Sequence, residues 1–177
     1  MKMIRFILCL LIAVCIVRAE SLCRAESEEP DYCYEEYEEL YCSVIMRTNG
    51  LGAPDFELHS RAFRAMFITL IMDMEIQNGG IARFFWNKGA AYAALVPESL
   101  RTVGLDDVAA LYEAFLAEQG ITLAEIDGYR TAYPDMVAVY ETHPFDDFDD
   151  AYMKIWTETN INLRLLTYGA VHPEMLL

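Results

Sequence analysis

Carboxylates are the most concentrated reactive groups of this 177-residue chain, and they gather in two short segments. Clustered carboxylates can bind calcium or can present negative charge to a basic partner. One cluster comprises Asp146, Asp147, Asp149 and Asp150. The other lies near the N-terminus and comprises Glu28, Glu29, Asp31, Glu35, Glu36, Glu38 and Glu39. We take both clusters as candidate partner-binding surfaces.

The aspartates of residues 146–150 do not follow the pattern of a calcium-binding loop. They lack the alternating spacing and the central glycine that such a loop needs. Acidic residues are favoured at the N-terminus of a helix, because they interact well with the helix dipole. We therefore expect a solvent-facing helix N-terminus here and no metal site.

The other residue types that often carry chemistry are scattered. His59, His143 and His172 have no metal-ligand spacing, so we interpret them as surface or loop histidines. No nucleophile elbow, phosphate-binding loop or dinucleotide-binding motif occurs. We therefore expect no catalytic residues, no metal and no cofactor, and a hydrolase or metalloenzyme is the least favoured class.

The five cysteines all lie in the first quarter of the chain, so they are no disulfide framework for the main domain. If the chain is exported, Cys23 can pair with Cys33 or with Cys42. A bridge between Cys33 and Cys42 is excluded, since nine residues on one helix separate them by about 13 Å. The cysteines are Cys9, Cys15, Cys23, Cys33 and Cys42.

A pair of glycines interrupts the most apolar part of the chain. Glycine reaches positive φ without steric cost, so the pair predicts a forced turn between two helices. The polar side chains beside it can form a polar site, or they can hold the turn and cap helix ends, which we favour. We interpret the aromatic triplet that follows as part of the hydrophobic core, in preference to the lining of a ligand pocket. The motif comprises Glu75, Asn78, Gly79, Gly80, Phe84, Phe85, Trp86 and Asn87.

The apolar residues of the segments that must position these groups follow helical spacing. No alternating strand pattern of useful length occurs. Residues 62–76 are apolar on nearly every side, which is typical of a buried central helix or a membrane span. Asp73, Glu75 and the short length favour the buried helix. Further helices are expected over about residues 31–46, 81–86, 97–103, 107–119, 122–133, 136–141, from 146 onward, and 160–169.

Several local signals refine these expected helices. Asp106 is expected to cap the helix that ends at Gly120, and Thr122 with Glu125 fits a capping box. In the last helix we expect Leu163, Leu166 and Ala170 to face inward. The predicted fold class is all-α: a single compact multi-helix domain around a buried central helix, preceded by a signal peptide.

Residues 1–19 have the pattern of a secretory signal peptide. Lys2 and Arg5 precede a 12-residue apolar segment, Phe6 to Val17, and Val17-Arg18-Ala19 fits a cleavage site. We expect a periplasmic or secreted protein, with an acidic segment over 20–34 and a helical domain over 35–177. A misassigned start codon, which would leave the protein cytoplasmic, and a buried N-terminal helix are the alternatives.

The chain carries 28 acidic and 13 basic residues, a formal net charge of -15. Removal of residues 1–19 takes away three basic residues and leaves a net charge of -18. Such a chain repels nucleic acid and anionic membranes, so we expect no direct binding to either. It attracts basic partners, including the basic faces of DNA-binding proteins. The alternative is that the acidity only solvates the surface.

The glycine turn and its surroundings resemble the domain that forms the C-terminal part of DNA mimic protein nineteen and its relatives. The resemblance covers about residues 35–177, and its departures are Ile81, where an aromatic residue or Leu is usual, and Arg83, where Gln is common. It rests on Glu75, Asn78-Gly79-Gly80, Phe84-Phe85-Trp86-Asn87, the segment Leu100-Arg101-Thr102-Val103-Gly104, and Phe145-Asp146-Asp147-Phe148-Asp149.

This resemblance implies an all-helical fold and leaves a homodimer open. It also implies that at least one relative imitates DNA with surface carboxylates and occupies a DNA-binding protein. Carboxylates spaced along helices can copy the charge density of duplex phosphates, about one per 1.7 Å of helix axis. The competing hypothesis is an exported helical protein of the immunity or inhibitor type, in which the acidity is only a solvated surface.

Overall fold

The computed structural model describes residues 32–48, 56, 59–143 and 145–176. The predicted signal peptide and the carboxylates Glu28, Glu29 and Asp31 lie outside the described residues, as do Cys9, Cys15 and Cys23. Cys42, on the described part of the chain, is an exposed free thiol.

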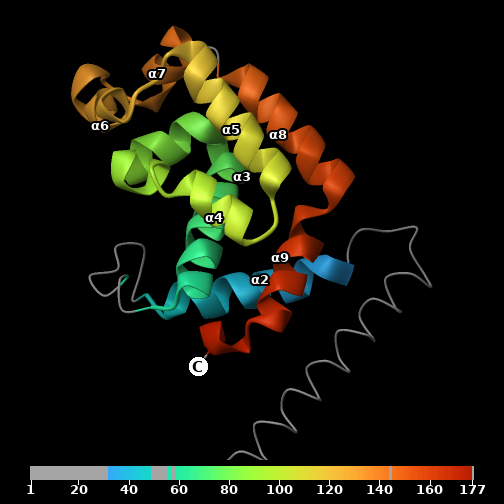
Figure 1. Cartoon of the computed structure of the whole chain (residues 1–177). Helices are drawn as coiled ribbons and strands as arrows, with labels where there is room; N and C mark the ends of the chain where they lie inside the picture. The colour runs from blue at the N-terminus through green and yellow to red at the C-terminus, as the bar shows by residue number, and fades with distance from the viewer. Residues whose placement is uncertain (1–31, 49–55, 57–58, 144, 177) are drawn as a thin grey trace, which may run out of the picture. The chain divides into compact units, whose positions relative to one another are not determined.

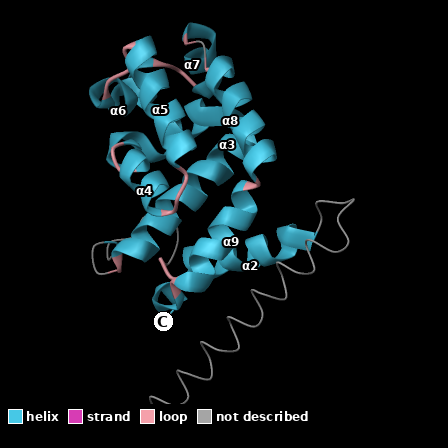
Figure 2. Cartoon of the chain, turned by 45° about the vertical axis from the view of Figure 1, so that its right-hand side comes forward, coloured by secondary structure: helices cyan, strands magenta, loops and turns pink. Residues whose placement is uncertain are grey.

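The described residues form eight α-helices and no strand, which confirms the predicted all-α class (Figure 2). Most of the helices begin and end close to the boundaries expected from the sequence, but α3 joins the two helices expected over 62–76 and 81–86 and continues to Ala93. They are α2 (Tyr32–Met46), α3 (Arg61–Ala93), α4 (Val96–Thr102), α5 (Asp106–Gln119), α6 (Leu123–Ala132), α7 (Met136–Thr142), α8 (Asp146–Thr159) and α9 (Ile161–Val171), followed by the short 3₁₀ helix η2 (Pro173–Leu176).

The chain divides into two compact units. The first combines the residues up to Phe63 with Asn162–Leu177, so α2, most of α9 and η2 belong to it. In this unit Gly169 packs against Leu40, since a Cβ at position 169 would lie 3.2 Å from Leu40 Cδ1. The second unit, Arg64–Ile161, holds most of α3 and helices α4 to α8.

Helix α3 is the buried central helix that the apolar run predicted. Met66, Phe67, Leu70 and Ile71 are almost completely buried in it. Its backbone is non-helical at Gly79, Gly80 and Gly89, so the glycine pair does break the run as expected. Among the described residues no helix combines the length and the apolar character that crossing a membrane requires.

The core of the second unit is aromatic. Helix α5 packs against both α4 and α8 (Figure 1). The Phe115 ring lies 4.9 Å from that of Phe148 and 5.7 Å from that of Phe145, centroid to centroid. Phe84 and Phe85, which follow the glycine pair, are fully buried, and Phe85 contacts the Phe145 ring. The aromatic triplet is therefore core, as predicted, although Trp86 is only partly buried.

Two local expectations are corrected. Asp106 is the first residue of α5 and not its cap, because the buried Leu105 occupies the N-cap position without a side-chain hydrogen bond. In α9 the structure buries Ile161 and Leu165, while Leu163, Leu166 and Ala170 stay partly exposed. This helix is apolar on several sides, so spacing alone did not select the buried one. The Thr122–Glu125 capping box is confirmed.

Candidate functional site

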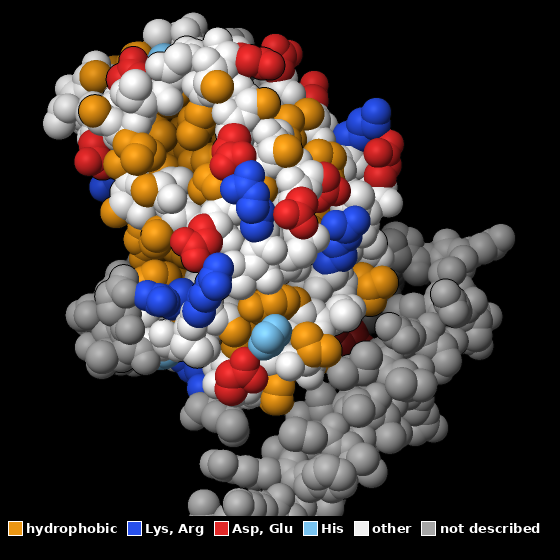
Figure 3. Space-filling model, in the orientation of Figure 1, with side chains coloured by type: hydrophobic (Ala, Val, Ile, Leu, Met, Phe, Trp, Pro, Cys, Tyr) orange, Lys and Arg blue, Asp and Glu red, His pale blue; other side chains and the backbone are white. Residues whose placement is uncertain are grey.

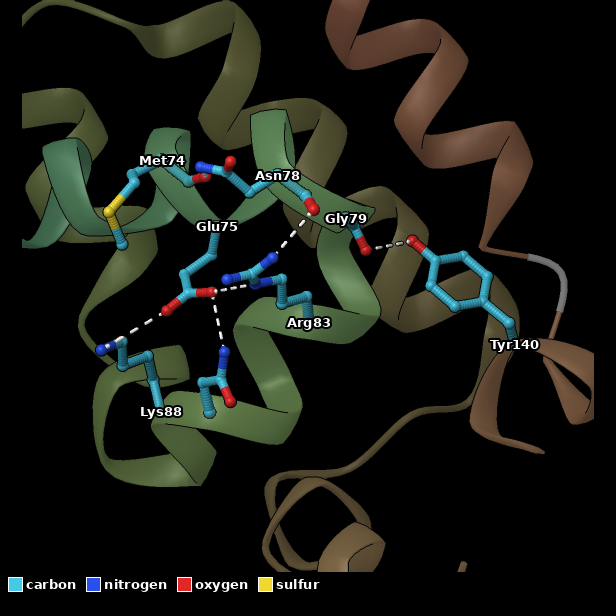
Figure 4. Close-up of polar contacts among 8 residues, drawn as sticks. Met74, Glu75, Asn78, Gly79, Arg83, Lys88 and Tyr140 are labelled. Carbon is cyan, nitrogen blue, oxygen red and sulfur yellow. Dashed lines mark hydrogen bonds and ion pairs between the residues drawn. The ribbon is translucent and has the colours of Figure 1, made fainter. Parts of the chain in front are cut away.

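The carboxylate of Glu75 is the centre of a buried polar cluster beside the glycine pair (Figure 4). Its Oε2 accepts hydrogen bonds from Arg83 Nε and Asn87 Nδ2, each at 2.8 Å. Lys88 Nζ lies 3.5 Å from the other oxygen, and the Lys88 side chain is only 7% exposed. Glu75 precedes the break in α3 and its partners follow it. The carboxylate therefore ties the two parts of the helix together.

Asn78 supports the same turn through its side chain and its backbone. Its Nδ2 donates to the Met74 carbonyl at 2.7 Å, and its own carbonyl accepts from Arg83 Nη1 at 2.9 Å (Figure 4). Glu75, Asn78 and Asn87 therefore hold the turn, as we favoured. Arg83 and Lys88 were not predicted as part of this cluster, because they come close to Glu75 only after the chain has folded back at the glycine pair.

Asp149 does not share the exposed setting of its acidic neighbours, so the expectation that all four aspartates of residues 146–150 face solvent is wrong for this residue. Its Oδ1 accepts the Ile81 backbone N–H at 2.8 Å, and its Oδ2 lies 2.6 Å from the Tyr140 hydroxyl. That hydroxyl also lies 2.9 Å from the Gly79 carbonyl oxygen (Figure 4). Through these contacts α7 and α8 are fixed to the break in α3.

Gly80 is the residue that makes this approach feasible. Its φ of +75° lies in the left-handed region, where a side chain is disfavoured. A Cβ there would lie 1.6 Å from Tyr140 Oη and 2.1 Å from Asp149 Oδ2. The second glycine of the motif is therefore needed for its backbone conformation and for the space that it leaves.

The inward position of Asp149 could have been read from the sequence. It follows Phe145 by four residues and precedes Tyr152 by three, and both aromatic side chains are buried. Positions three and four apart share a helix face, so Asp149 belongs to the core side of α8. Tyr140 carried no comparable signal, because 61 residues separate it from Gly79.

A third carboxylate, that of Asp73, forms hydrogen bonds inside the second unit. Asp73, on α3, is 3% exposed and accepts a hydrogen bond from the Tyr152 hydroxyl of α8. Gln77 Nε2 lies 3.5 Å from the same oxygen. Asp73 and Asp149 together connect α8 to α3 at two separate points.

The remaining aspartates of residues 146–150 face solvent at the start of α8. Asp146, Asp147 and Asp150 are exposed, and α8 begins at Asp146, so the predicted helix N-terminus is confirmed. None of the three forms an ion pair with another described residue. Nothing in their geometry gathers them around a metal, and among the described residues no group of three acidic, His or Cys side chains could hold one.

Two further exposed carboxylates belong to the same end of the second unit. Glu118 lies on α5 one turn beyond Phe115, whose ring contacts Phe145 and Phe148 at the start of α8. Glu141 lies in the last turn of α7, just before the same segment. We call this group the carboxylate end; it consists of Glu118, Glu141, Asp146, Asp147 and Asp150.

Elsewhere on this unit, two exposed carboxylates have basic partners. Arg101 forms a two-bond ion pair with Glu113, and Lys154 lies 3.9 Å from Glu158 on the same helix. The face drawn in Figure 3 accordingly shows acidic and basic side chains side by side across its middle. At its upper end it shows acidic side chains without basic ones among them.

The acidic residues of α2 belong to the other unit. Glu35, Glu36, Glu38 and Glu39 are all exposed, on a helix whose Leu40 and Val44 are buried. This amphipathic arrangement is the one that the sequence predicted for residues 31–46. The two acidic clusters are therefore carried by separate units of the chain.

The histidines contact aromatic rings or a carboxylate. The His59 ring stacks on Phe63 with 4.2 Å between centroids, and His143 Nε2 lies 3.1 Å from the Tyr133 hydroxyl. His172 Nδ1 lies 2.9 Å from Glu174, and this contact lowers the pKa of the Glu174 carboxyl. These separate contacts bring no two histidines together.

Fold and surface together define an all-helical acidic protein with a structural glycine turn in its central helix and with a group of exposed carboxylates at the start of α8. A model of the DMP19-like protein family matches residues 57–172, about two thirds of the chain. The chain therefore belongs to the DMP19-like family, which confirms the resemblance seen in the sequence and implies a protein of the DNA-mimic kind. No curated protein and no solved structure matches the chain significantly.

Proposed function

We propose that this protein binds a basic, DNA-binding protein and that the carboxylate end takes the place of duplex phosphates. The observation that carries the proposal is the group of five exposed carboxylates without basic partners, in a chain of the DMP19-like family. A DNA-binding surface holds lysine and arginine side chains that gain affinity from closely spaced negative charges. The function proposed is binding, without catalysis.

The carboxylate end is preferred to α2 as the docking surface for two reasons. The family match includes residues 146–150 and begins after residue 56, so it leaves out the α2 glutamates. Asp149 also fixes the first turn of α8 to α3 through Ile81 and Tyr140. A preformed surface loses less conformational freedom on binding, which favours affinity.

The test compares two variants that remove the same number of charges. One is Asp146→Asn with Asp147→Asn and Asp150→Asn, and the control changes Glu35, Glu36 and Glu38 to Gln. Basic DNA-binding proteins of the source cell are captured on the immobilised protein and eluted by salt steps or by duplex DNA. We expect the aspartate variant to weaken binding about tenfold or more, with a smaller salt dependence, and the α2 variant to bind normally.

Two results would contradict the proposal. One is a complex that persists unchanged at high salt, since phosphate-like contacts weaken steeply with ionic strength. The other is a complex that duplex DNA does not displace, because a mimic and DNA must compete for the same basic surface. If only the α2 variant loses binding, the docking surface belongs to α2.

A second candidate function is favoured by the secretory pattern of residues 1–19. It is an exported helical protein of the immunity or inhibitor type, periplasmic or secreted, whose acidity only solvates its surface. A reporter enzyme fused after residue 25 separates the two candidates. Export would make a DNA-binding partner untenable, whereas a reporter retained in the cytoplasm supports the mimic.

A further inference from the structure

Three oxygen atoms form a short chain at the break in α3. Tyr140 Oη lies 2.9 Å from the Gly79 carbonyl oxygen and 2.6 Å from Asp149 Oδ2. The other Asp149 oxygen accepts the Ile81 backbone N–H. Both distances are those of hydrogen bonds between oxygen atoms, and each such bond needs one hydrogen.

A count of hydrogens shows that one is missing. A tyrosine hydroxyl supplies a single hydrogen, and neither a carbonyl oxygen nor an ionised carboxylate supplies any. The Ala82 N–H lowers the pKa of the Tyr140 phenol, but it places no hydrogen between the three oxygens. With Asp149 ionised, one of the two short contacts brings oxygen atoms together without a hydrogen. A proton on Asp149 Oδ2 completes the chain, as Asp149 donates to Tyr140 and Tyr140 donates to Gly79.

We propose that Asp149 is a proton-binding group of the free protein and that docking of a cationic partner at the carboxylate end expels its proton. The first part rests on the hydrogen count alone. The second part rests on the function proposed above, because it needs a partner that neutralises Asp146 and Asp150. The consequence is an affinity for the basic partner that rises with pH.

The surroundings of Asp149 agree with this assignment. Burial raises the pKa of the Asp149 carboxyl, and the charges of Asp146 and Asp150 raise it further. The hydrogen bonds from Tyr140 and from the Ile81 N–H act in the opposite direction. Burial likewise raises the pKa of the Tyr140 phenol, so this group stays protonated.

Among the described residues, the charged groups that act on the Asp149 carboxyl are Asp146 and Asp150. On α3 the guanidinium of Arg83 is held by Glu75 and by the Asn78 carbonyl. On α7 the titratable group that faces Asp149 is Tyr140, while Glu141 is exposed. Helix α5 packs aromatic rings against α8, such as Phe115 against Phe148. The charges that act on Asp149 from its own helix are therefore the solvent-facing ones that a partner would cover.

The first test is a carboxyl carbon NMR titration of the full chain. We expect the midpoint of Asp149 to lie above those of Asp146 and Asp150. A midpoint at or below theirs would overturn the proton-binding assignment. This measurement needs no partner and no substitution, so it remains decisive whatever happens to the proposed function.

Thermal unfolding of Asp149→Asn provides a second test, with Asp147→Asn as the matched control. The asparagine amide supplies the missing hydrogen at every pH, so we expect a Tm about 2–4 °C above that of the unmodified protein at pH 7.5. A raised carboxyl pKa stabilises the fold below the unfolded pKa and loses this effect as pH rises through the folded value. The advantage of Asp149→Asn should therefore fade towards pH 4. A Tm of Asp149→Asn at pH 7.5 that is no higher than that of the unmodified protein contradicts the assignment.

Coupling to the carboxylate end is tested with an oligolysine peptide by calorimetry in buffers of different ionisation enthalpy. We expect the unmodified protein and Glu158→Gln, a change outside the carboxylate end, to release protons on binding and Asp149→Asn to release none. Binding of the peptide without proton release would contradict the proposed coupling between docking and Asp149. The proton-binding assignment of Asp149 would still be decided by the NMR titration. Failure of the peptide to bind at low salt counts against the proposed function and, with it, against the coupling.

Discussion

The second unit uses carboxylates in two opposite ways. Asp73, Glu75 and Asp149 point inward and each receives hydrogen bonds or ion pairs from other parts of the unit. Asp146, Asp147 and Asp150 point outward and have no basic partner among the described residues. Asp149 and Asp150 are chain neighbours of the same residue type, so composition does not separate the two groups. The difference teaches that residue type alone does not identify a binding surface; the helix face must also be known.

The two groups differ because of the cost of burial. A buried carboxylate needs donors that replace its lost water, and those donors fix the elements that carry them. An exposed carboxylate keeps its water and costs little, so its charge stays available to a partner. The inward group therefore sets the shape of the unit, and the outward group gives it an electrostatic surface.

Glu75→Gln should have the largest effect on stability. A small effect would contradict the distinction between buried and exposed carboxylates most directly. The substitution leaves the buried Lys88 ammonium and the Arg83 guanidinium without their counter-charge. Removing one partner of a buried pair typically costs about 3–5 kcal/mol. We expect a loss of this order in the free energy of unfolding, measured by urea denaturation.

The matched control for this change is Glu158→Gln. Glu158 also faces a lysine, Lys154 at 3.9 Å, but both side chains are more than half exposed. We expect this pair to contribute less than about 1 kcal/mol. Equal losses in the two variants would show that burial does not distinguish the two groups of carboxylates.

Gly80→Ala should have an intermediate effect and tests the space beside the Tyr140 and Asp149 side chains. Its Cβ would overlap both of them, whereas a Cβ at Gly104 would meet nothing within 4 Å. Both glycines have positive φ, +75° and +82°, so backbone strain is common to the two substitutions. We expect Gly80→Ala to cost about 1–3 kcal/mol more than Gly104→Ala, the value of the disrupted buried hydrogen bonds. Equal losses of stability in the two variants, measured by thermal unfolding, would mean that backbone strain alone accounts for the effect of Gly80→Ala.

Glu113→Gln should have the smallest effect and sharpens the comparison from the exposed side. The hydrogen bonds from Arg101 lower the pKa of Glu113 below its ordinary value of 4.5. A lowered carboxyl pKa stabilises the fold above the unfolded pKa, and this contribution is lost as pH falls through the folded value. We expect a slight loss of stability at pH 7 that disappears below about pH 4 and in high salt. A loss that salt leaves unchanged would mean that this pair behaves as a buried one.

Much of the fold could be predicted because its signals are local. Thr122 and Glu125 form their capping box within one helical turn, and Gly120 ends α5 in the left-handed conformation. The apolar run of α3 and its glycine break also depend on neighbours in the chain. The face of α9 that is buried could not be predicted in this way, because apolar residues occur on several of its sides.

The candidate site was predictable only in part. The exposure of Asp146, Asp147 and Asp150 was predicted from their place at a helix N-terminus, but the same reasoning was wrong for Asp149. The role of Glu75 and Asn78 in the turn was predicted from the adjacent glycines. Arg83, Lys88 and Tyr140 were missed, because their contacts form only when the chain folds back at Gly79 and Gly80. The division of the two acidic clusters between separate units also had no signature in composition.

The sequence by itself determined the all-helical class, the glycine turn, the DMP19-like family and the strong negative charge, since these depend on spacing and residue type. Only the tertiary structure decided which carboxylates are available to a partner. Asp149 is not available to a partner, because Gly80, with no side chain, lets α7 and α8 approach the α3 backbone. Its neighbours are available because one residue along a helix turns a side chain by about 100°, from the core into water.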